Sequence, residues 1–134
     1  MSDGRALVLF AHGARDAQWA EPFAKIAGFL RERNPDTPVL LAFLELMQPS
    51  LDEAIGTLVA QGRQRITLVP LFLARGGHLK NDLPALIGVI ERRYPDLQIH
   101  VTEAIGEVES ILRHIADWAE DQFLQKQIDE IADK

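Results

Sequence analysis

Three short runs of mainly apolar residues and a fourth, more mixed one divide the chain, and each is far too short to cross a membrane. Continuous apolar runs of this length are typical of strands that are buried on both faces of a parallel sheet. The predicted strands are residues 6–11, 39–46, 66–73 and 97–102.

Between these runs the apolar residues recur every three or four positions, which predicts amphipathic helices. We expect helices at 18–33, at 50–62, from residue 81 or 82 to 93, and from about 107 onward. Ser50 and Glu53 stand in the positions of a capping box, and Gly62 has the place of a C-terminal glycine.

Strand and helix therefore alternate four times, which predicts an α/β fold: a four-stranded parallel sheet with helices on both faces and right-handed crossovers. A length of 134 residues allows one domain with a real core. We expect a single domain over 1–134, with its core at about 6–119 and a polar C-terminal helix or tail at 120–134.

Composition excludes several classes of protein. The net charge of -6 argues against nonspecific binding of nucleic acid. The absence of cysteine rules out disulfides, thiolate catalysis and thiolate metal sites. The first five residues lack the pattern of a signal peptide, so we expect a cytoplasmic protein with no membrane partner.

His12, Glu45 and His78 fall at or just beyond the carboxyl ends of the first three predicted strands. Because parallel strands end at the same edge of a sheet, where ligands bind in open α/β folds, these three side chains are expected to converge. Two imidazoles and a carboxylate suit cobalt, nickel, iron or zinc, and are too few and too rich in nitrogen for calcium or magnesium.

Each residue also has a plainer interpretation. His12 could be a turn histidine, Glu45 a solvated residue at a strand end, and His78, after Gly76-Gly77, an exposed loop residue. The coincidence of all three at corresponding places favours a site. The remaining histidines, His100 and His114, are expected on an edge strand and on a solvated helix face.

Three motifs together resemble the small CbiX-type chelatases, the short relatives of the sirohydrochlorin cobalt and iron chelatases. These motifs are AHGAR around His12, FLE around Glu45 and VPLFLARGGHLKNDLP around His78. The third motif is the specific one, and the resemblance runs from Leu7 to about Ala119. The sequence departs from the family at Ala14, where a serine is more common, so a role for position 14 is doubtful.

The resemblance implies a lyase that inserts a divalent metal into a tetrapyrrole such as sirohydrochlorin, in cobalamin or sirohaem biosynthesis. It implies Co²⁺ first, with Fe²⁺ or Ni²⁺ as alternatives, and the metal is a substrate. His12 and His78 match the family's two metal-site histidines, and Glu45 matches the acidic residue that accompanies them in the larger chelatases. Since the longer relatives hold two such domains and this chain holds one, the resemblance implies a homodimer.

A carboxylate-rich substrate needs positive partners, which the net charge does not supply. We assign substrate binding to Arg15, Arg75 and Lys80, with Gly76 and Gly77 as the turn between the last two. Arg75 and Lys80 could equally be solvated loop charges. No organic cofactor is expected, because the chain has neither GxGxxG nor GxxxxGK[ST].

Two other functions remain open from the residues. The domain could bind and deliver a metal without inserting it. It could also be a phosphotransfer enzyme with His12 as nucleophile, but such a site wants arginine immediately before the histidine, and Ala11 stands there.

Overall fold

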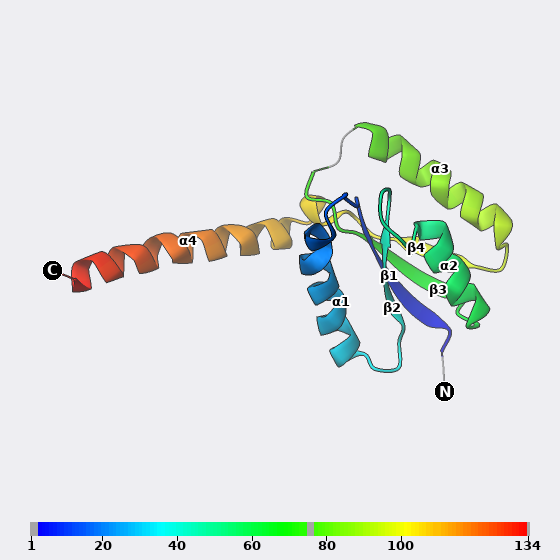
Figure 1. Ribbon diagram of the computed structural model, residues 1–134, viewed down its shortest axis with the longest axis horizontal. Helices are drawn as coiled ribbons and strands as arrows, with labels where there is room; N and C mark the ends of the chain where they lie inside the picture. Colours follow the sequence, from blue (N-terminus) through cyan, green and yellow to red (C-terminus); the bar gives the residue numbers. More distant parts are fainter. Residues whose placement is uncertain (1–2, 75–76, 134) are drawn as a thin grey trace.

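The protein is a four-stranded parallel sheet with helices on both faces, as expected from the sequence (Figure 1). The computed structural model describes residues 3–74 and 77–133, and the side chains of residues 77–80 lie outside the described part. The strands lie in the order β2-β1-β3-β4. Their bounds are β1 Arg5–Ala11, β2 Val39–Phe43, β3 Arg65–Pro70 and β4 Gln98–Val101.

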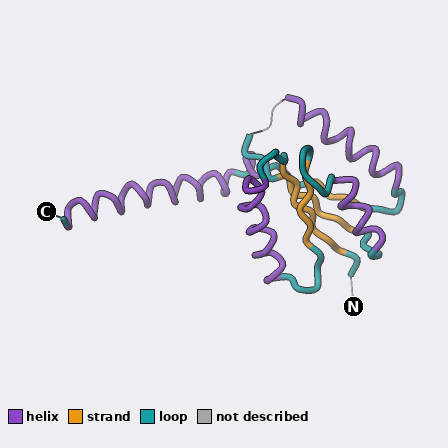
Figure 2. Tube along the Cα trace, in the orientation of Figure 1, coloured by secondary structure: helices purple, strands orange, loops and turns teal. Residues whose placement is uncertain are grey.

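Helices follow each strand in turn, which confirms the predicted alternation (Figure 2). They are α1 Glu21–Arg33, α2 Leu51–Ala60, α3 Gly77–Arg93 and α4 Glu109–Ala132, with short 3₁₀ turns η1 Ala17–Ala20 and η2 Ile105–Glu107. Helices α2 and α3 cover one face of the sheet, and α1 covers part of the other. The sheet therefore has a core on each face, of unequal size.

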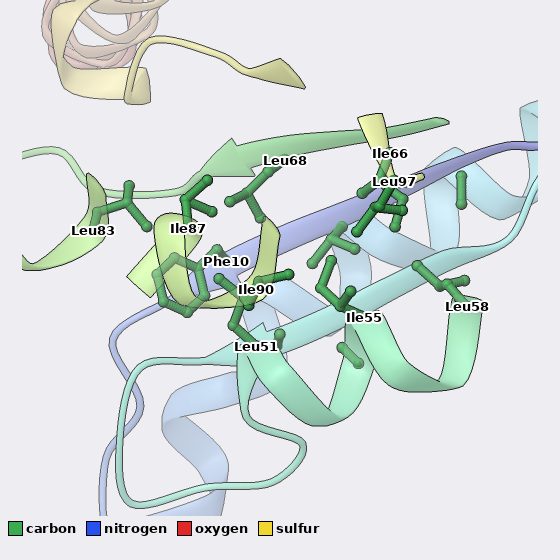
Figure 3. Close-up of a cluster of buried hydrophobic side chains, with 14 of the residues drawn as sticks. Phe10, Leu51, Ile55, Leu58, Ile66, Leu68, Leu83, Ile87, Ile90 and Leu97 are labelled. Carbon is green, nitrogen blue, oxygen red and sulfur yellow. The ribbon is translucent and has the colours of Figure 1, made fainter. Parts of the chain in front are cut away.

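The larger core lies between the sheet and helices α2 and α3 (Figure 3). Alternate residues of β1 and β3, among them Val8, Phe10 and Leu68, are fully buried there against Ile55 and Ile90. The smaller core, under α1, contains Leu9, Ala27, Val39 and Leu71. Burial on both faces explains why β1 reads as an unbroken apolar run.

The start of α2 forms as predicted. The Ser50 side chain accepts a hydrogen bond from the Glu53 backbone N–H, and the Glu53 carboxylate accepts one from the Ser50 N–H. After the helix, Gly62 has a φ of +80°, a conformation that glycine adopts without a steric penalty.

Two predicted strands ended three residues too late, and one helix was predicted to start too late. Strand β2 ends at Phe43 rather than residue 46, because the chain turns back and the Phe43 N–H donates to the Pro49 carbonyl. Strand β3 ends at Pro70 rather than residue 73, although Leu71 and Phe72 remain buried. Helix α3 begins at Gly77, so Asn81 and Asp82 lie inside it and do not cap it.

Helix α4 leaves the body of the protein and extends away from it (Figure 1). Its main tertiary contact is with η2, immediately before it in the chain. The helix continues to Ala132, through the segment that was expected to be a polar helix or tail. Within 3–74 and 77–133, none of the helices combines the length and the apolar character that a membrane span requires.

Candidate metal and tetrapyrrole site

The candidate site begins where β1 ends. Strand β1 stops at Ala11, and His12 follows with its side chain half-buried. The imidazole meets the ring of Phe72 edge-on, with 4.7 Å between ring centroids and 60° between the ring planes. Phe72 is itself buried and packs at 5.7 Å against Phe10. The His12 ring therefore packs against the core, and His12 remains partly exposed to solvent.

Glu45 lies beside His12 because the two strand ends stay hydrogen-bonded past the strands. The Leu44 N–H donates to the Ala11 carbonyl at 2.9 Å, and the Glu45 N–H donates to the His12 carbonyl at 3.0 Å. The chain then reverses at Leu46, whose φ is +66°, and the Glu45 side chain is exposed. The expected proximity of these two residues is thus present in the backbone itself.

Gly13 allows this close approach. Its φ is +94°, and a Cβ built on it would lie 1.8 Å from the Glu45 carbonyl oxygen. A side chain at this position cannot fit unless the loop that carries Glu45 moves. The glycine after His12 therefore sets how closely the two predicted site residues lie.

The third member of the predicted set is only partly placed. His78 lies in the first turn of α3, and its side chain is outside the described residues. Among the predicted substrate contacts, Arg75 and Gly76 lie outside the described residues, and so does the Lys80 side chain. The Gly77 backbone is described and begins α3. Figure 1 shows the amino end of α3 at the same end of the sheet as the carboxyl ends of β1 and β2.

The described side chains do not complete a metal site by themselves. Among the described side chains, those of residues 3–74 and 81–133, no three histidines, aspartates or glutamates stand close enough together to hold a metal ion. His12 and Glu45 supply one imidazole and one carboxylate, a donor pair that suits divalent cobalt, iron or nickel. A further donor is needed, and His78 is the residue that the sequence offers.

Gly106 is a site-positioning residue that sequence reasoning missed. Its N–H donates to the Phe72 carbonyl at 3.0 Å, and a Cβ on it would lie 1.6 Å from the Leu73 carbonyl oxygen. It thereby holds η2 against the segment that leads from β3 to α3. A lone glycine between the fourth apolar run and the last helix was the signal that could have found it.

Arg15 lies three residues after His12 and is exposed. The other titratable groups described next lie away from this edge. The pKa of Asp3 is lowered to about 2 by hydrogen bonds from Arg5, at the opposite end of β1. His100 is exposed on the edge strand β4, and His114 is exposed on α4 with its Nδ1 2.7 Å from the Ser110 carbonyl, so both predictions of surface positions are confirmed.

A parallel α/β sheet with a histidine and a carboxylate at its carboxyl edge is an arrangement suited to handling a divalent metal. The CbiX family model matches residues 6–122, and the chain belongs to the CbiX family.

Proteins similar to this chain include sirohydrochlorin chelatases. The chain is 37% identical over 86 residues to a sirohydrochlorin cobaltochelatase of Methanococcus aeolicus, over 64% of this chain and 60% of that protein. It therefore aligns with less than two thirds of the length of that relative. The crystal structure of a putative cobalamin (vitamin B12) biosynthesis CbiX protein from Marinobacter aquaeolei VT8 matches with a TM-score of 0.80 and 35% identity, over 90% of this chain and 98% of that one.

A third match extends over part of a longer chain. The sirohydrochlorin chelatase SirB from Bacillus subtilis subspecies spizizenii, solved in complex with cobalt, has a TM-score of 0.69 and 29% identity. The match includes 87% of this chain and 50% of the SirB chain.

Proposed function

We propose that this protein is a chelatase that inserts Co²⁺ into a sirohydrochlorin-type tetrapyrrole and works as a homodimer. The observation that carries the proposal is the pairing of His12 with Glu45 at the carboxyl edge of the sheet, in a chain of the CbiX family. Fe²⁺ and Ni²⁺ are alternative substrates, because they accept the same imidazole and carboxylate ligands.

The reaction exchanges one metal ion for two protons. Two pyrrole N–H bonds of the macrocycle break, and the two nitrogens bind the incoming ion, so the protein must hold the metal and accept protons. Neutral imidazole suits both tasks, because it is a metal ligand and titrates near neutral pH. We assign metal binding to His12 and His78, and assign Glu45 to completing the ligand set or accepting a proton.

The half-buried position of His12 supports its assigned role. Its edge contact with Phe72 restrains the ring, which lowers the cost of ordering the ligand when the metal arrives. Glu45, by contrast, is exposed on a loop, where it can reach toward a metal or toward the macrocycle. A restrained imidazole beside an exposed carboxylate fits a site that must bind a metal and then release it.

The carboxylates of the substrate require cations around this edge. Arg15, exposed after the first motif, is the described residue in the right place. We propose that Arg75 and Lys80 join it from the segment between β3 and α3, with Gly76 and Gly77 allowing the macrocycle to approach the backbone. Guanidinium groups pair with carboxylates in two parallel hydrogen bonds, which would orient the macrocycle over the site.

The test is a spectrophotometric assay of metal insertion. Purified protein is mixed anaerobically with sirohydrochlorin and Co²⁺, Fe²⁺ or Ni²⁺ in separate reactions, and the absorbance of the macrocycle is followed. We expect a rate above the spontaneous one, highest with Co²⁺. Rates equal to the spontaneous rate with all three metals would refute the chelatase proposal, and tight metal binding in the same preparation would then favour metal delivery.

A further inference from the structure

Two leucines are exposed at the edge of the sheet that carries His12. Leu46 is 61% exposed and Leu73 is 60% exposed. In the part of the chain whose side chains are described, the other exposed large apolar residues all lie on helices. These two instead lie in the short connections that follow strands β2 and β3. Their common place in the fold calls for a common explanation.

The strand order places the two leucines on either side of His12. Strand β1, which His12 follows, lies between β2 and β3. Leu46 comes three residues after the end of β2, and Leu73 comes three residues after the end of β3. Neighbouring strands are about 4.8 Å apart, so roughly 10 Å separates the two connections. The leucines therefore flank the imidazole at corresponding places.

Leu46 has a backbone conformation that leucine rarely adopts. Its φ is +66°, and the Met47 N–H donates to the Glu45 carbonyl at 2.8 Å, which closes a three-residue turn. A positive φ is unfavourable for a branched side chain, and glycine adopts it without a steric penalty. Because Leu46 is largely exposed, its burial does not compensate for this strain. A strained, exposed residue beside a candidate site is typical of contact with a ligand.

Close backbone contacts hold both leucines in place. A Cβ on Gly13 would lie 1.8 Å from the carbonyl oxygen of Glu45, the residue before Leu46. A Cβ on Gly106 would lie 1.6 Å from the carbonyl oxygen of Leu73 itself. Of the glycines that the structure describes, these two make the closest approaches. Each exposed leucine is thus carried by a backbone that is packed against a neighbouring segment, which lowers the cost of ordering it around a ligand.

We propose that Leu46 and Leu73 form the apolar support for one face of the tetrapyrrole, with His12 between them below the centre of the ring. The inference rests on the proposed chelatase function and names the residues that recognise the ring itself. The faces of a tetrapyrrole are largely hydrocarbon, whereas its carboxylates lie at the periphery. A metal ion at the centre of the ring is reached from a face, so an imidazole flanked by two apolar side chains matches this substrate.

The same two leucines distinguish between functions that the sequence leaves open. A hydrated metal ion alone gains nothing from two apolar side chains, and neither does a phosphoryl group. An apolar ring that covers the exposed part of one leucine binds roughly tenfold more tightly. The leucine pair therefore favours a site for a tetrapyrrole over a site for metal delivery or phosphotransfer.

The experiment measures binding of metal-free sirohydrochlorin under anaerobic conditions, from the change in the fluorescence of the macrocycle. The variants are Leu46→Gly and Leu73→Ala. Val89→Ala is the control, because Val89 is also exposed but lies twelve residues, about 18 Å, from the start of α3. We expect the Kd to rise about tenfold in each leucine variant and to stay at the wild-type value in the control.

The melting temperature and the insertion kinetics separate substrate binding from a structural role. Glycine relieves the positive φ at position 46, so Leu46→Gly should melt at or above the wild-type temperature while it binds the macrocycle more weakly. In the Co²⁺ insertion assay, KM should rise with little change in kcat, because the leucines support the ring equally before and during insertion. Wild-type affinity in either leucine variant would overturn the proposal. A lower melting temperature or an altered solution mass with unchanged affinity would do the same, since the leucines would then serve the fold or contact another chain.

The two measurements also separate this inference from the chelatase proposal. If wild type binds sirohydrochlorin but inserts none of the three metals, the chelatase proposal fails and the comparison of affinities still tests the leucines. If wild type inserts metal and a leucine variant keeps full affinity, only the present inference fails. A wild type that does not bind the macrocycle at all overturns both.

Discussion

Because Gly13 has no side chain, the backbone that carries His12 can lie close to the backbone of Glu45, the other described residue of the candidate site. The positive φ and the 1.8 Å approach to the Glu45 carbonyl are separate constraints at one position. The first alone costs a residue with a Cβ about 1–2 kcal/mol. The second forces the Glu45 loop away from His12, so this glycine links the stability of the fold to the geometry of the site.

We therefore expect Gly13→Ala to destabilise the protein by at least about 3 kcal/mol, because backbone atoms cannot yield as the end of a side chain does. The free energy of unfolding is measured by denaturant titration. Gly62→Ala is the matched control, since Gly62 also has a positive φ, +80°, but nothing lies within 4 Å of its Cβ position. We expect the control to lose only about 1 kcal/mol, and equal losses in the two variants would contradict the argument.

His12 is the described imidazole of the proposed metal site, so removing it tests the assignment directly. We expect His12→Ala to lower the rate of metal insertion by about 10²–10³-fold, as removal of a positioned ligand or proton acceptor does. The assay is the absorbance change of sirohydrochlorin with Co²⁺. His100→Ala is the control, because His100 is exposed on the edge strand away from the site. Full activity in His12→Ala would remove His12 from the site and leave family membership intact.

At the scale of elements, the sequence predicted the alternation of strands and helices and the sheet that they form. It was less accurate at the carboxyl ends of strands. Leu71 and Phe72 follow the end of β3 but remain buried in the core, so their apolar character continues that of the strand. An apolar composition indicates that a segment is buried, but it does not distinguish a buried strand from a buried connection.

The start of α3 was mispredicted for a related reason. Asn81 and Asp82 are favourable cap residues, but a helix also tolerates them in its exposed interior, where both lie. The proximity of His12 and Glu45 was predictable, because the rule that parallel strands end at one edge brings them together. The position of Gly106 before the last helix is a signal in the sequence, but the backbone contact that it makes with Leu73, in a segment distant in the sequence, is visible only in the structure.

Gly106 gives a prediction at this scale. Its close approach to Leu73 fixes η2 against the segment that leads into α3, so Gly106→Ala must displace one of the two. We expect lower thermal stability and a raised KM for the tetrapyrrole, because the displaced segment precedes the proposed substrate contacts. The measurements are a melting curve and insertion kinetics. Gly28→Ala, at a helical position with open space around it, should melt at or above the wild-type temperature.

At the scale of the whole molecule, the exposed α4 raises the question of what stabilises it. Helices depend on tertiary packing for most of their stability, and α4 packs mainly on the short turn η2 in a single copy. Its sequence also lacks one continuous apolar face, because the apolar residues lie on different sides in its two halves. Both features leave the packing of α4 incomplete in a single copy.

If the chain folds as the homodimer proposed above, the stability of the protein depends on its concentration. Each tenfold increase in protein adds about 1.4 kcal/mol per dimer to the free energy of unfolding, which corresponds to a rise in Tm of roughly 2–4 °C. We expect wild type to show this rise between micromolar and hundred-micromolar protein in calorimetry. A wild-type Tm that is constant over this range would mean that each copy folds alone, and it would contradict the proposed homodimer.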